Sequence, residues 1–386
     1  MSVEIRRFRE EEYPALLSLI DTAFSFEQGD FLALLPKLYK KEYSPWENNL
    51  CAFEDGVPAA AIGAYYDTVT VGGQALSVCG IGNVGVHPDY RGRGYMISLM
   101  EALTDEMDRR GADISVLGGD RFRYAHFGYE GACPGCIYSV GAHTLGKQLG
   151  LRAAGLHEVT SADDALLSGI ERLYRGADIA FARGGGSFYD TLLSWKNRIF
   201  CFVENGEVTA YCTVGGDGYV GELRAGNLSA DGLGADGLGE FLLGVMEKTG
   251  RDSVNLFAGM NDLLLRDCAS KICDEASVRD CERILVLRWE SFICACLTAQ
   301  ARKTRPDDVS CVIRIRGAKR TEQLRISVLG GEVSVTPDGG EPDYDFTWRE
   351  ASDIMLKAVS ARREELPAAL RALFPLRFSV SQPDMV

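Results

Sequence analysis

The chain has 386 residues, of which 46% are hydrophobic and 25% charged, a composition typical of globular proteins and not of fibres or disordered chains. The 41 Lys and Arg residues against 55 Asp and Glu residues give a net charge of −14, which disfavours binding to nucleic-acid phosphates. At roughly 100–200 residues per domain, this length predicts two to four domains.

Residues 4–12 are rich in charge, whereas a secretory signal would need an apolar run there. No segment reaches the roughly 18 apolar residues of a membrane span. We therefore expect a cytoplasmic protein without a membrane partner. Its 12 cysteines are then expected to be reduced thiols, most of them buried.

Two segments 150 residues apart resemble each other. Residues 50–60 (LCAFEDGVPAA) and 200–210 (FCFVENGEVTA) each predict two strands joined by a tight turn, Asp-Gly in one and Asn-Gly in the other. Farther along, residues 111–119 and 250–259 form a second similar pair. Each is preceded by a segment in which apolar residues have helical spacing. The same order of elements twice predicts two related α/β domains with mixed sheets.

The strongest chemical signal is the segment 82–96 (GNVGVHPDYRGRGYM), which predicts a strand, a glycine-rich turn and the start of a helix. Backbone N–H groups and the positive end of the helix dipole converge at such a turn. Gly92 and Gly94 let a bulky anion approach the backbone, and Arg91 and Arg93 add charged donors. The turn is therefore predicted to hold a pyrophosphate; the alternative is a plain strand-to-helix turn with two solvated arginines.

Two other motifs point to different ligands. G-x-G-x-x-G occurs at 80–85, 216–221 and 232–237, but a chain with 43 glycines supplies it by chance. Only the last precedes a helix, and no buried parallel strand is predicted before it, so a dinucleotide site is a weak alternative. The pair Cys133 and Cys136 lacks the further ligands that zinc needs, and Pro134-Gly135 between them predicts a turn. No metal is expected.

The last part of the chain has a different pattern. VIRIRG, LRISVLGGEVSVTP and YDFTW alternate apolar and polar positions, with a hairpin turn at Gly330-Gly331. Helices are expected over 354–359 and 366–373. Antiparallel strands with helices predict a small α+β module. The expected domains are 1–147, 148–290 and 291–386.

The order V-x-V-x-P-x-x-R-G-x-G in residues 84–94 resembles the acetyl-CoA motif of the GCN5-related N-acetyltransferases. Met96, where most of that family has Gly or Ala, resembles the subfamily named for enhanced intracellular survival, as does RYAHFGY at 123–129. The resemblance implies two tandem acetyltransferase domains, a sterol-carrier-like domain and a homo-oligomer, expected to be a hexamer. It implies acetyl-CoA as co-substrate, bound by Val84, Gly85, Val86, Arg91, Gly92, Arg93, Gly94, Tyr95 and Met96.

The resemblance also implies the catalytic residues. Tyr124 aligns with the proton donor to the CoA sulfur, with Tyr129 as its rival. The C-terminal carboxylate, here that of Val386, would be the base, with Asp384 as a substitute. An N–H near Val86 would polarise the acetyl carbonyl. The expected reaction is acetyl transfer to a primary amine of a small cation, an aminoglycoside-like molecule or a protein lysine; the alternative is a non-catalytic acyl-CoA or lipid-binding protein.

Charges elsewhere complete the expectations. The second copy has no arginine beside its turn glycines, and Asp231 and Asp236 would repel a pyrophosphate there, so one acetyl-CoA per chain is expected. Asp21, Glu27 and Asp30 could attract a cationic amine, although each could equally be a solvated charge.

Overall fold

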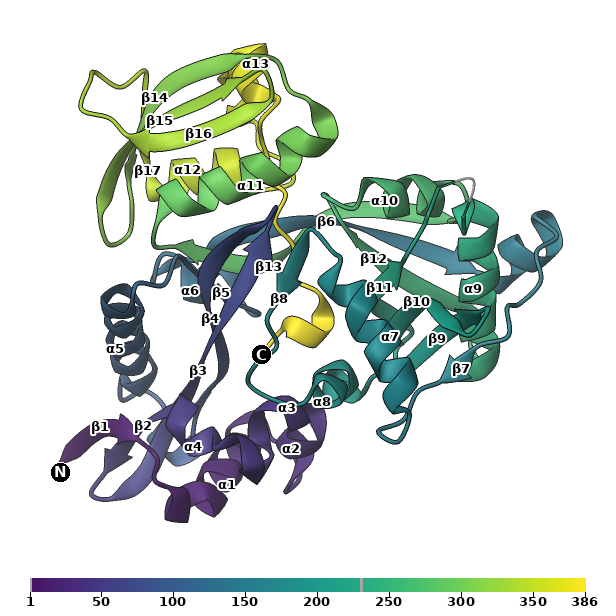
Figure 1. Ribbon diagram of the computed structural model, residues 1–386. Helices are drawn as coiled ribbons and strands as arrows, with labels where there is room; N and C mark the ends of the chain where they lie inside the picture. Colours follow the sequence, from purple (N-terminus) through teal and green to yellow (C-terminus); the bar gives the residue numbers. More distant parts are fainter. Residues whose placement is uncertain (1, 230–231) are drawn as a thin grey trace.

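The computed structural model describes residues 2–229 and 232–386 (Figure 1). A 13-stranded mixed sheet runs through the first two thirds of the chain, and a separate four-stranded sheet lies in the last third. The predicted class, mixed α/β sheets followed by a small α+β domain, is confirmed. No helix in the described part of the chain is long and apolar enough to cross a membrane.

The first third of the chain builds one end of the large sheet, with α5 on one face. Its elements are β1 (Val3–Arg7), α1 (Tyr13–Phe24), α2 (Asp30–Leu34), α3 (Pro36–Tyr39), α4 (Pro45–Asn48), β2 (Asn49–Glu54), β3 (Val57–Val71), β4 (Gln74–Val86), α5 (Tyr95–Arg110), β5 (Ile114–Leu117), α6 (Arg121–Ala125) and β6 (Glu130–Gly141). The β2–β3 turn has φ +47° at Asp55 and +83° at Gly56, which confirms the predicted hairpin.

The second third repeats this order of elements. It contains β7 (His157–Glu158), α7 (Asp164–Arg175), β8 (Ile179–Phe181), α8 (Phe188–Leu193), β9 (Arg198–Glu204), β10 (Glu207–Val214), β11 (Tyr219–Ala225), α9 (Gly234–Thr249), β12 (Ser253–Gly259), α10 (Leu263–Ser270) and β13 (Glu275–Val286). The β9–β10 turn has similar positive φ angles, +52° at Asn205 and +82° at Gly206. Helices α5 and α9 both have 16 residues, and both end at a glycine in the left-handed conformation.

The two halves are joined by an exchange of strands. Strand β6 leaves the first half and pairs with β12 of the second half. Strand β13 returns from the second half and pairs with β5 of the first, with Arg283 opposite Leu117. Because β6 and β13 also pair with each other, the halves share one continuous sheet.

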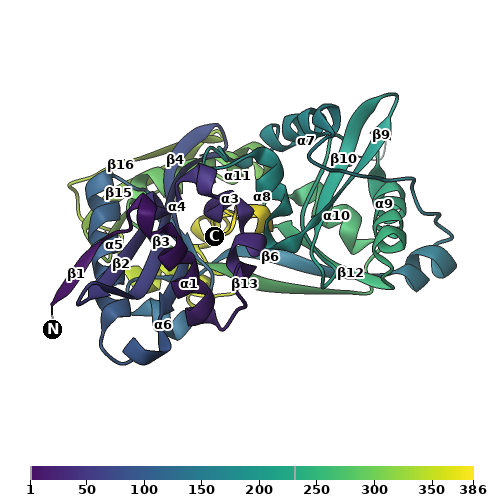
Figure 2. The same cartoon turned by 90° about the horizontal axis from the view of Figure 1, so that it is seen from below.

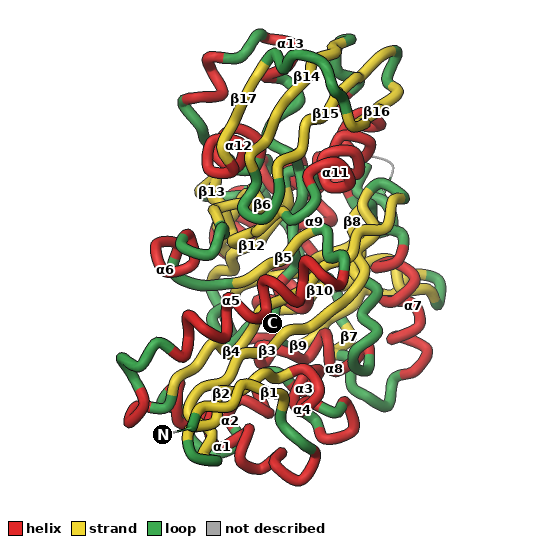
Figure 3. Tube along the Cα trace, turned by 90° about the vertical axis from the view of Figure 1, so that its left-hand side faces the viewer, coloured by secondary structure: helices red, strands yellow, loops and turns green. Residues whose placement is uncertain are grey.

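The last third packs on the large sheet through a long helix. It contains α11 (Trp289–Thr304), β14 (Val309–Arg316), β15 (Thr321–Leu329), β16 (Glu332–Pro337), β17 (Tyr344–Thr347), α12 (Trp348–Met355) and α13 (Ala368–Arg371). Figure 3 shows the small sheet above α11 and α12. One hydrophobic core contains Phe292 of α11 together with Val78 of β4 and Ile313 of β14, so α11 is buried between the two sheets.

Two predicted helices of this domain are wrong in extent. Helix α12 ends at Met355, and Val359 is 78% exposed. The chain turns away there because Arg363 donates to the carbonyls of Ile354 and Ala358. Helix α13 spans only four residues, since Pro367 forces an extended residue before it. The hairpin at Gly330-Gly331 is confirmed.

Two further predictions are corrected. Pro134-Gly135 is not a turn: it lies inside β6, where Cys133 takes φ +56° at an irregularity in the pairing with β13. A buried strand, β11, does precede α9 and pairs in parallel with β12. The sequence did not indicate this strand because Glu222 interrupts its apolar run. In the fold, Glu222 is buried in an ion pair with Arg183.

The chain ends between the two halves. Residues 375–386, named the tail below, run from the small domain into the middle of the molecule. Figures 1 and 2 both show the C-terminus there, beside α3 and α8. Gln300 of α11 holds the start of this path, since its amide nitrogen donates to the carbonyl of Leu373 and its oxygen accepts from the N–H of Arg377.

Candidate active site

In the first half, strands β4 and β5 separate and leave an opening between them. Their parallel pairing ends at Ile81 opposite Leu117, although β4 continues to Val86. Its register with β3 shifts at this point, and Asn83 takes φ +41°, so the strand bulges. The backbone of 84–86 thereby lines a slot with no neighbouring β5 strand, and Val84 and Val86 are only half-buried.

The predicted anion cradle follows this slot directly. Gly92 and Gly94 have φ +79° and +82°, and a Cβ on either would meet open space. Gly94 is the N-cap of α5 and carries no side chain to cap it, which leaves the first N–H groups of the helix free for a ligand. These features fit a bound pyrophosphate.

In the cradle, Arg91 is available to a ligand, whereas Arg93 and Tyr95 hold the turn in place. Arg91 is exposed, and its guanidinium reaches only the carbonyl of Ala23, at 3.4 Å. Arg93 pairs with Glu54 at 2.5 Å, and the buried Tyr95 donates its hydroxyl to the same carboxylate. Glu54, which the sequence analysis did not single out, therefore fixes the turn. Met96 is half-buried in the apolar cluster of this half.

The two candidate tyrosines differ in their surroundings. Tyr129 is fully buried, and its hydroxyl lies 2.7 Å from Ser115 Oγ. Tyr124 is 6% exposed on α6 and packs against Gly119. Burial raises the pKa of the Tyr124 phenol, so it stays protonated at neutral pH, as a proton donor must.

The tail ends against β4. The Val386 side chain sits on Gly80, where a Cβ would lie 2.7 Å from Val386 Cγ2, and its carboxyl carbon lies 3.0 Å from the corresponding position on Gly82. Side chains at these glycines would fill the space that Val386 occupies. The terminal carboxylate is thus placed beside the bulge of β4, next to the slot.

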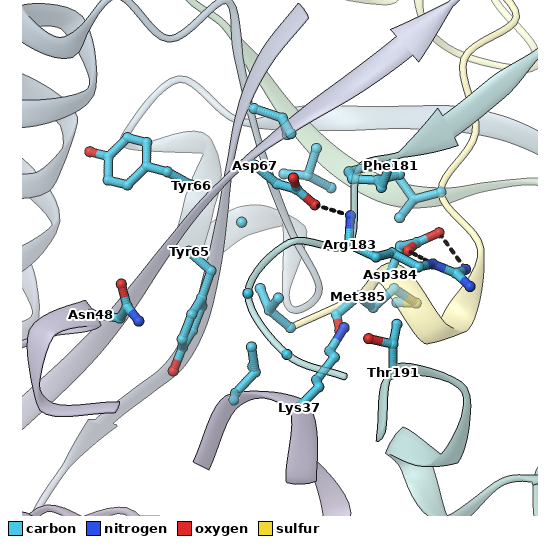
Figure 4. A pocket seen from close by; sticks show the side chains of 18 of the residues that line it. Lys37, Asn48, Tyr65, Tyr66, Asp67, Phe181, Arg183, Thr191, Asp384 and Met385 are labelled. Atoms are coloured by element: carbon cyan, nitrogen blue, oxygen red, sulfur yellow. Dashed lines mark hydrogen bonds and ion pairs between the residues drawn. The ribbon is translucent and has the colours of Figure 1, made fainter. Parts of the chain in front are cut away.

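A buried lysine holds the last residues of the tail. Lys37 of α3 donates to the carbonyls of Pro383 and Met385, at 2.5 and 2.6 Å (Figure 4). Burial lowers the pKa of Lys37 to about 7. The side chain is committed to the tail and so positions the Val386 carboxylate.

Asp384 anchors the tail to the second half. Arg183 binds Asp384 through Nε at 2.7 Å (Figure 4). It also binds Glu222 through Nη2 at 2.6 Å. Ser381 Oγ lies 2.6 Å from each of these two carboxylates. Burial raises the pKa of Asp384, but Arg183 outweighs this and holds it below the ordinary value. With both oxygens engaged, Asp384 is a structural anchor and not a free base.

The acidic residues near the N-terminus shape their own loop. Asp21 accepts hydrogen bonds from the backbone N–H groups of Gly29 and Phe31, at 2.7 and 3.1 Å. Asp30 accepts one from the N–H of Glu27 at 3.0 Å. Asp21 and Asp30 are occupied by the backbone and are not directed at a ligand.

A pocket of about 170 Å³ lies where the first half, the second half and the tail meet. Figure 4 shows Tyr65, Tyr66 and Asp67 of β3 on one side and Arg183 and Asp384 on the other. Gly80, Gly118, Glu282 and Val386 also line it. No pattern in the sequence indicates Glu282, because only the strand exchange brings β13 beside β5.

The second half differs from the first at the turn before its helix. The pairing of β11 and β12 ends at Val220 opposite Leu256, and the next residue, Gly221, abuts Gln382 of the tail, much as Gly82 faces Val386 in the first half. The turn before α9 is closed, because Asn227 occupies the space beside Gly232. Asp236 lies in the first turn of α9, whereas Asp231 lies outside the described residues.

Comparison with known proteins agrees with this geometry. Residues 4–132 match the family model described as an acetyltransferase (GNAT) domain. These residues are similar to a GNAT domain and are called the GNAT domain below. A search of curated proteins gives no match to the chain.

Solved structures match over the whole chain. A GCN5-related N-acetyltransferase from Anabaena variabilis has a TM-score of 0.66 at 16% identity, with 100% of both chains covered. One from Kribbella flavida has 0.66 at 18% identity, covering 100% of this chain and 99% of the other. Eis1 from Mycobacterium abscessus has 0.63 at 16% identity with the same coverage. These proteins therefore share the fold of the whole chain: the GNAT domain, the second half that repeats it, and the small domain.

Proposed function

We propose that the protein is an acetyl-CoA-dependent N-acetyltransferase that acts on a primary amine. The observation that carries this proposal is the open glycine cradle at the start of α5, placed directly after a bulged β4 that ends beside the chain's own C-terminal carboxylate. An anion site, a strand edge that β5 leaves unpaired and a base then lie next to one another, as acyl transfer from a thioester requires.

The chain's residues would divide the binding of acetyl-CoA between backbone and side chains. The N–H groups at the start of α5 and the guanidinium of Arg91 would hold the pyrophosphate. The backbone of 84–86 would pair with the pantetheine amides. The bound thioester supplies the acetyl group, and an N–H near Val86 would hold its carbonyl oxygen as negative charge develops there.

Acetyl transfer also needs two proton movements. The Val386 carboxylate would accept the proton that the amine nitrogen loses as the new C–N bond forms. Tyr124 would donate its phenolic proton to the sulfur as the C–S bond breaks. Lys37 and Arg183 would act only by positioning, since both hold the tail and neither faces the amine.

The closed turn before α9 supports one catalytic site per chain. The tail faces both halves, with Gln382 beside Gly221 and the Val386 carboxyl beside Gly82, but the turn before α5 has open glycines whereas Asn227 closes the turn before α9. We propose that the second half and the small domain serve to fix the tail, and that the protein assembles as a homo-oligomer in the cytoplasm.

Replacing Tyr124 by Phe tests the mechanism. We expect Tyr124→Phe to lower kcat for acetylation of spermidine by roughly 100-fold or more, while the Kd for acetyl-CoA stays within twofold. Release of free CoA thiol measures the first and calorimetry the second. Tyr129→Phe is the matched control: it breaks the buried contact with Ser115 and should lower Tm but keep kcat.

Two results would overturn the assignment. Full turnover by Tyr124→Phe with loss of turnover by Tyr129→Phe would reverse the roles of the tyrosines. A wild-type protein that binds acetyl-CoA but acetylates none of a panel of amines, aminoglycosides and lysine peptides would be the non-catalytic acyl-CoA binder.

A further inference from the structure

Glu282 is a buried carboxylate for which the proposed mechanism has no use. It lies on β13 and is 3% exposed. Its Oε2 has no hydrogen-bond partner among the described residues, yet the side chain lines the central pocket. A buried acidic oxygen without a partner costs free energy, and native proteins rarely leave one so unless a ligand completes it.

The sheet aims Glu282 to the same side as the terminal carboxylate. Ile81, Leu117 and Arg283 form one row across β4, β5 and β13. Gly82, Gly118 and Glu282 come directly after this last paired row, and their side-chain positions are on the opposite face from those of the row. Consistent with this, Glu282 Oε2 lies 3.7 Å from where a Cβ on Gly118 would stand, and the Val386 carboxyl lies beside Gly82.

The other charges of the pocket are already paired. Arg183 binds Asp384 and Glu222, and Lys37 binds the tail carbonyls. Asp67 accepts hydrogen bonds from two backbone N–H groups. Apart from the Val386 carboxylate, Glu282 is the pocket carboxyl group that this pairing leaves without a partner, and burial raises its pKa to about 8, with Arg283 opposing the rise. A cation bound beside Glu282 would favour its ionised form and displace the proton.

We propose that Glu282 is the specificity-determining residue of the acceptor site, where it binds a second cationic group of an amine whose first amino group reacts at Val386. This inference rests on the proposed acetyl transfer. The spacing supports it, because the last paired row, at Ile81, Leu117 and Arg283, spans two strand spacings of about 4.8 Å, which puts Gly82 and Glu282 beside it at roughly 10 Å or more from each other. A flexible chain with amino groups at both ends spans that distance.

Gly118 makes the arrangement possible. It lies between Gly82 and Glu282, where any side chain would stand in the path from one carboxylate to the other. The acceptor site is thus built from β4 and β5 of the GNAT domain, β13 of its repeat and the tail.

Paired substrates of equal length test the proposal. We would measure acetylation of 1,8-diaminooctane and of octylamine by the full-length wild type and by Glu282→Gln. Because glutamine cannot ionise to pair with the second ammonium group, the variant should raise KM for the diamine at least tenfold and leave KM for the monoamine within twofold, with kcat for the monoamine unchanged. Glu275→Gln is the matched control, since it removes one exposed charge from the same strand and should change neither KM.

The outcomes distinguish a failure of the role of Glu282 from a failure of the proposed acetyl transfer. An equal KM for the diamine in wild type and Glu282→Gln would overturn the role of Glu282 while leaving acetyl transfer intact. A rise in KM for both amines would also overturn it, because a merely structural role would produce that result. Absence of turnover in the wild type with either amine would instead count against the proposed function, and calorimetric binding of the diamine to wild type and variant would then decide the role of Glu282 independently.

Discussion

A buried carboxyl group changes stability with pH in a direction that its environment sets. The pKa of Glu282 is raised to about 8 from an ordinary value of 4.5 because the ionised form is desolvated. Between these two values the folded protein keeps a proton that the unfolded chain releases. The stability that Glu282 contributes is therefore complete below pH 4.5, declines as pH rises, and is lost by the time pH passes 8.

Glu282→Gln should remove this dependence. Glutamine resembles the protonated acid in shape, so the variant and the wild type should be equally stable near pH 4.5. Toward pH 8 the variant should gain on the wild type by up to about 1.4 kcal/mol per pH unit. Urea unfolding at pH 5, 6.5 and 8 measures the difference, and parallel pH profiles would show that the carboxylate is solvated or paired.

In the proposed function, acetyl-CoA binding depends on the start of α5. Gly94 has φ +82° and open space beside it, so an added methyl group both strains the backbone and intrudes on the cradle. Gly250 at the end of α9 has φ +68° and equally open surroundings, but no ligand site. The two positions separate backbone strain from loss of the anion site.

We expect Gly94→Ala and Gly250→Ala to lose similar stability, about 1 kcal/mol each. Only Gly94→Ala should weaken acetyl-CoA binding, by roughly tenfold, as measured by calorimetry. Equal acetyl-CoA affinity in the two variants would mean that the pyrophosphate does not approach this turn.

Local elements were predictable where local chemistry decides them. Asp55-Gly56 and Asn205-Gly206 adopt left-handed angles that few other pairs favour, so both hairpins follow from the sequence. The cradle follows in the same way from its spaced glycines. Helix α12 did not, because its end is set by the distant side chain of Arg363 reaching back to its carbonyls.

Long-range pairing explains what the sequence could not predict. Strands β6 and β13 carry ordinary strand patterns, and nothing in them indicates that each crosses to the other half. Glu282 enters the pocket only through that exchange. Likewise Glu222 and Arg183 are each unremarkable charges in the sequence, and only the fold pairs them around Asp384.

The tail couples the three parts of the molecule. It leaves the small domain beside Gln300, is anchored to the second half through Asp384, and ends in the GNAT domain under Lys37. The base of the proposed reaction is thus the end of a chain segment that crosses every domain. Catalysis should therefore respond to changes that loosen the tail far from the cradle.

Lys37→Met should show this dependence. It removes two hydrogen bonds to the tail, at about 0.5–1.5 kcal/mol each, and so should lower kcat at least tenfold while acetyl-CoA affinity stays within twofold. Lys41→Met, at an exposed position on the same segment, is the control and should leave kcat unchanged. Unaltered turnover in Lys37→Met would show that the tail needs no support from Lys37.

The central claim is that the whole chain has one acetyl-CoA site, in the GNAT domain, because the corresponding turn of the second half is closed by Asn227 and has no arginine beside its glycines. Calorimetric titration of the full-length protein with acetyl-CoA, with NADH as the control ligand, tests it most directly. We predict one acetyl-CoA per chain, no binding of NADH, and a weakened single site in Gly94→Ala. Two acetyl-CoA molecules per chain, or none, would contradict the account.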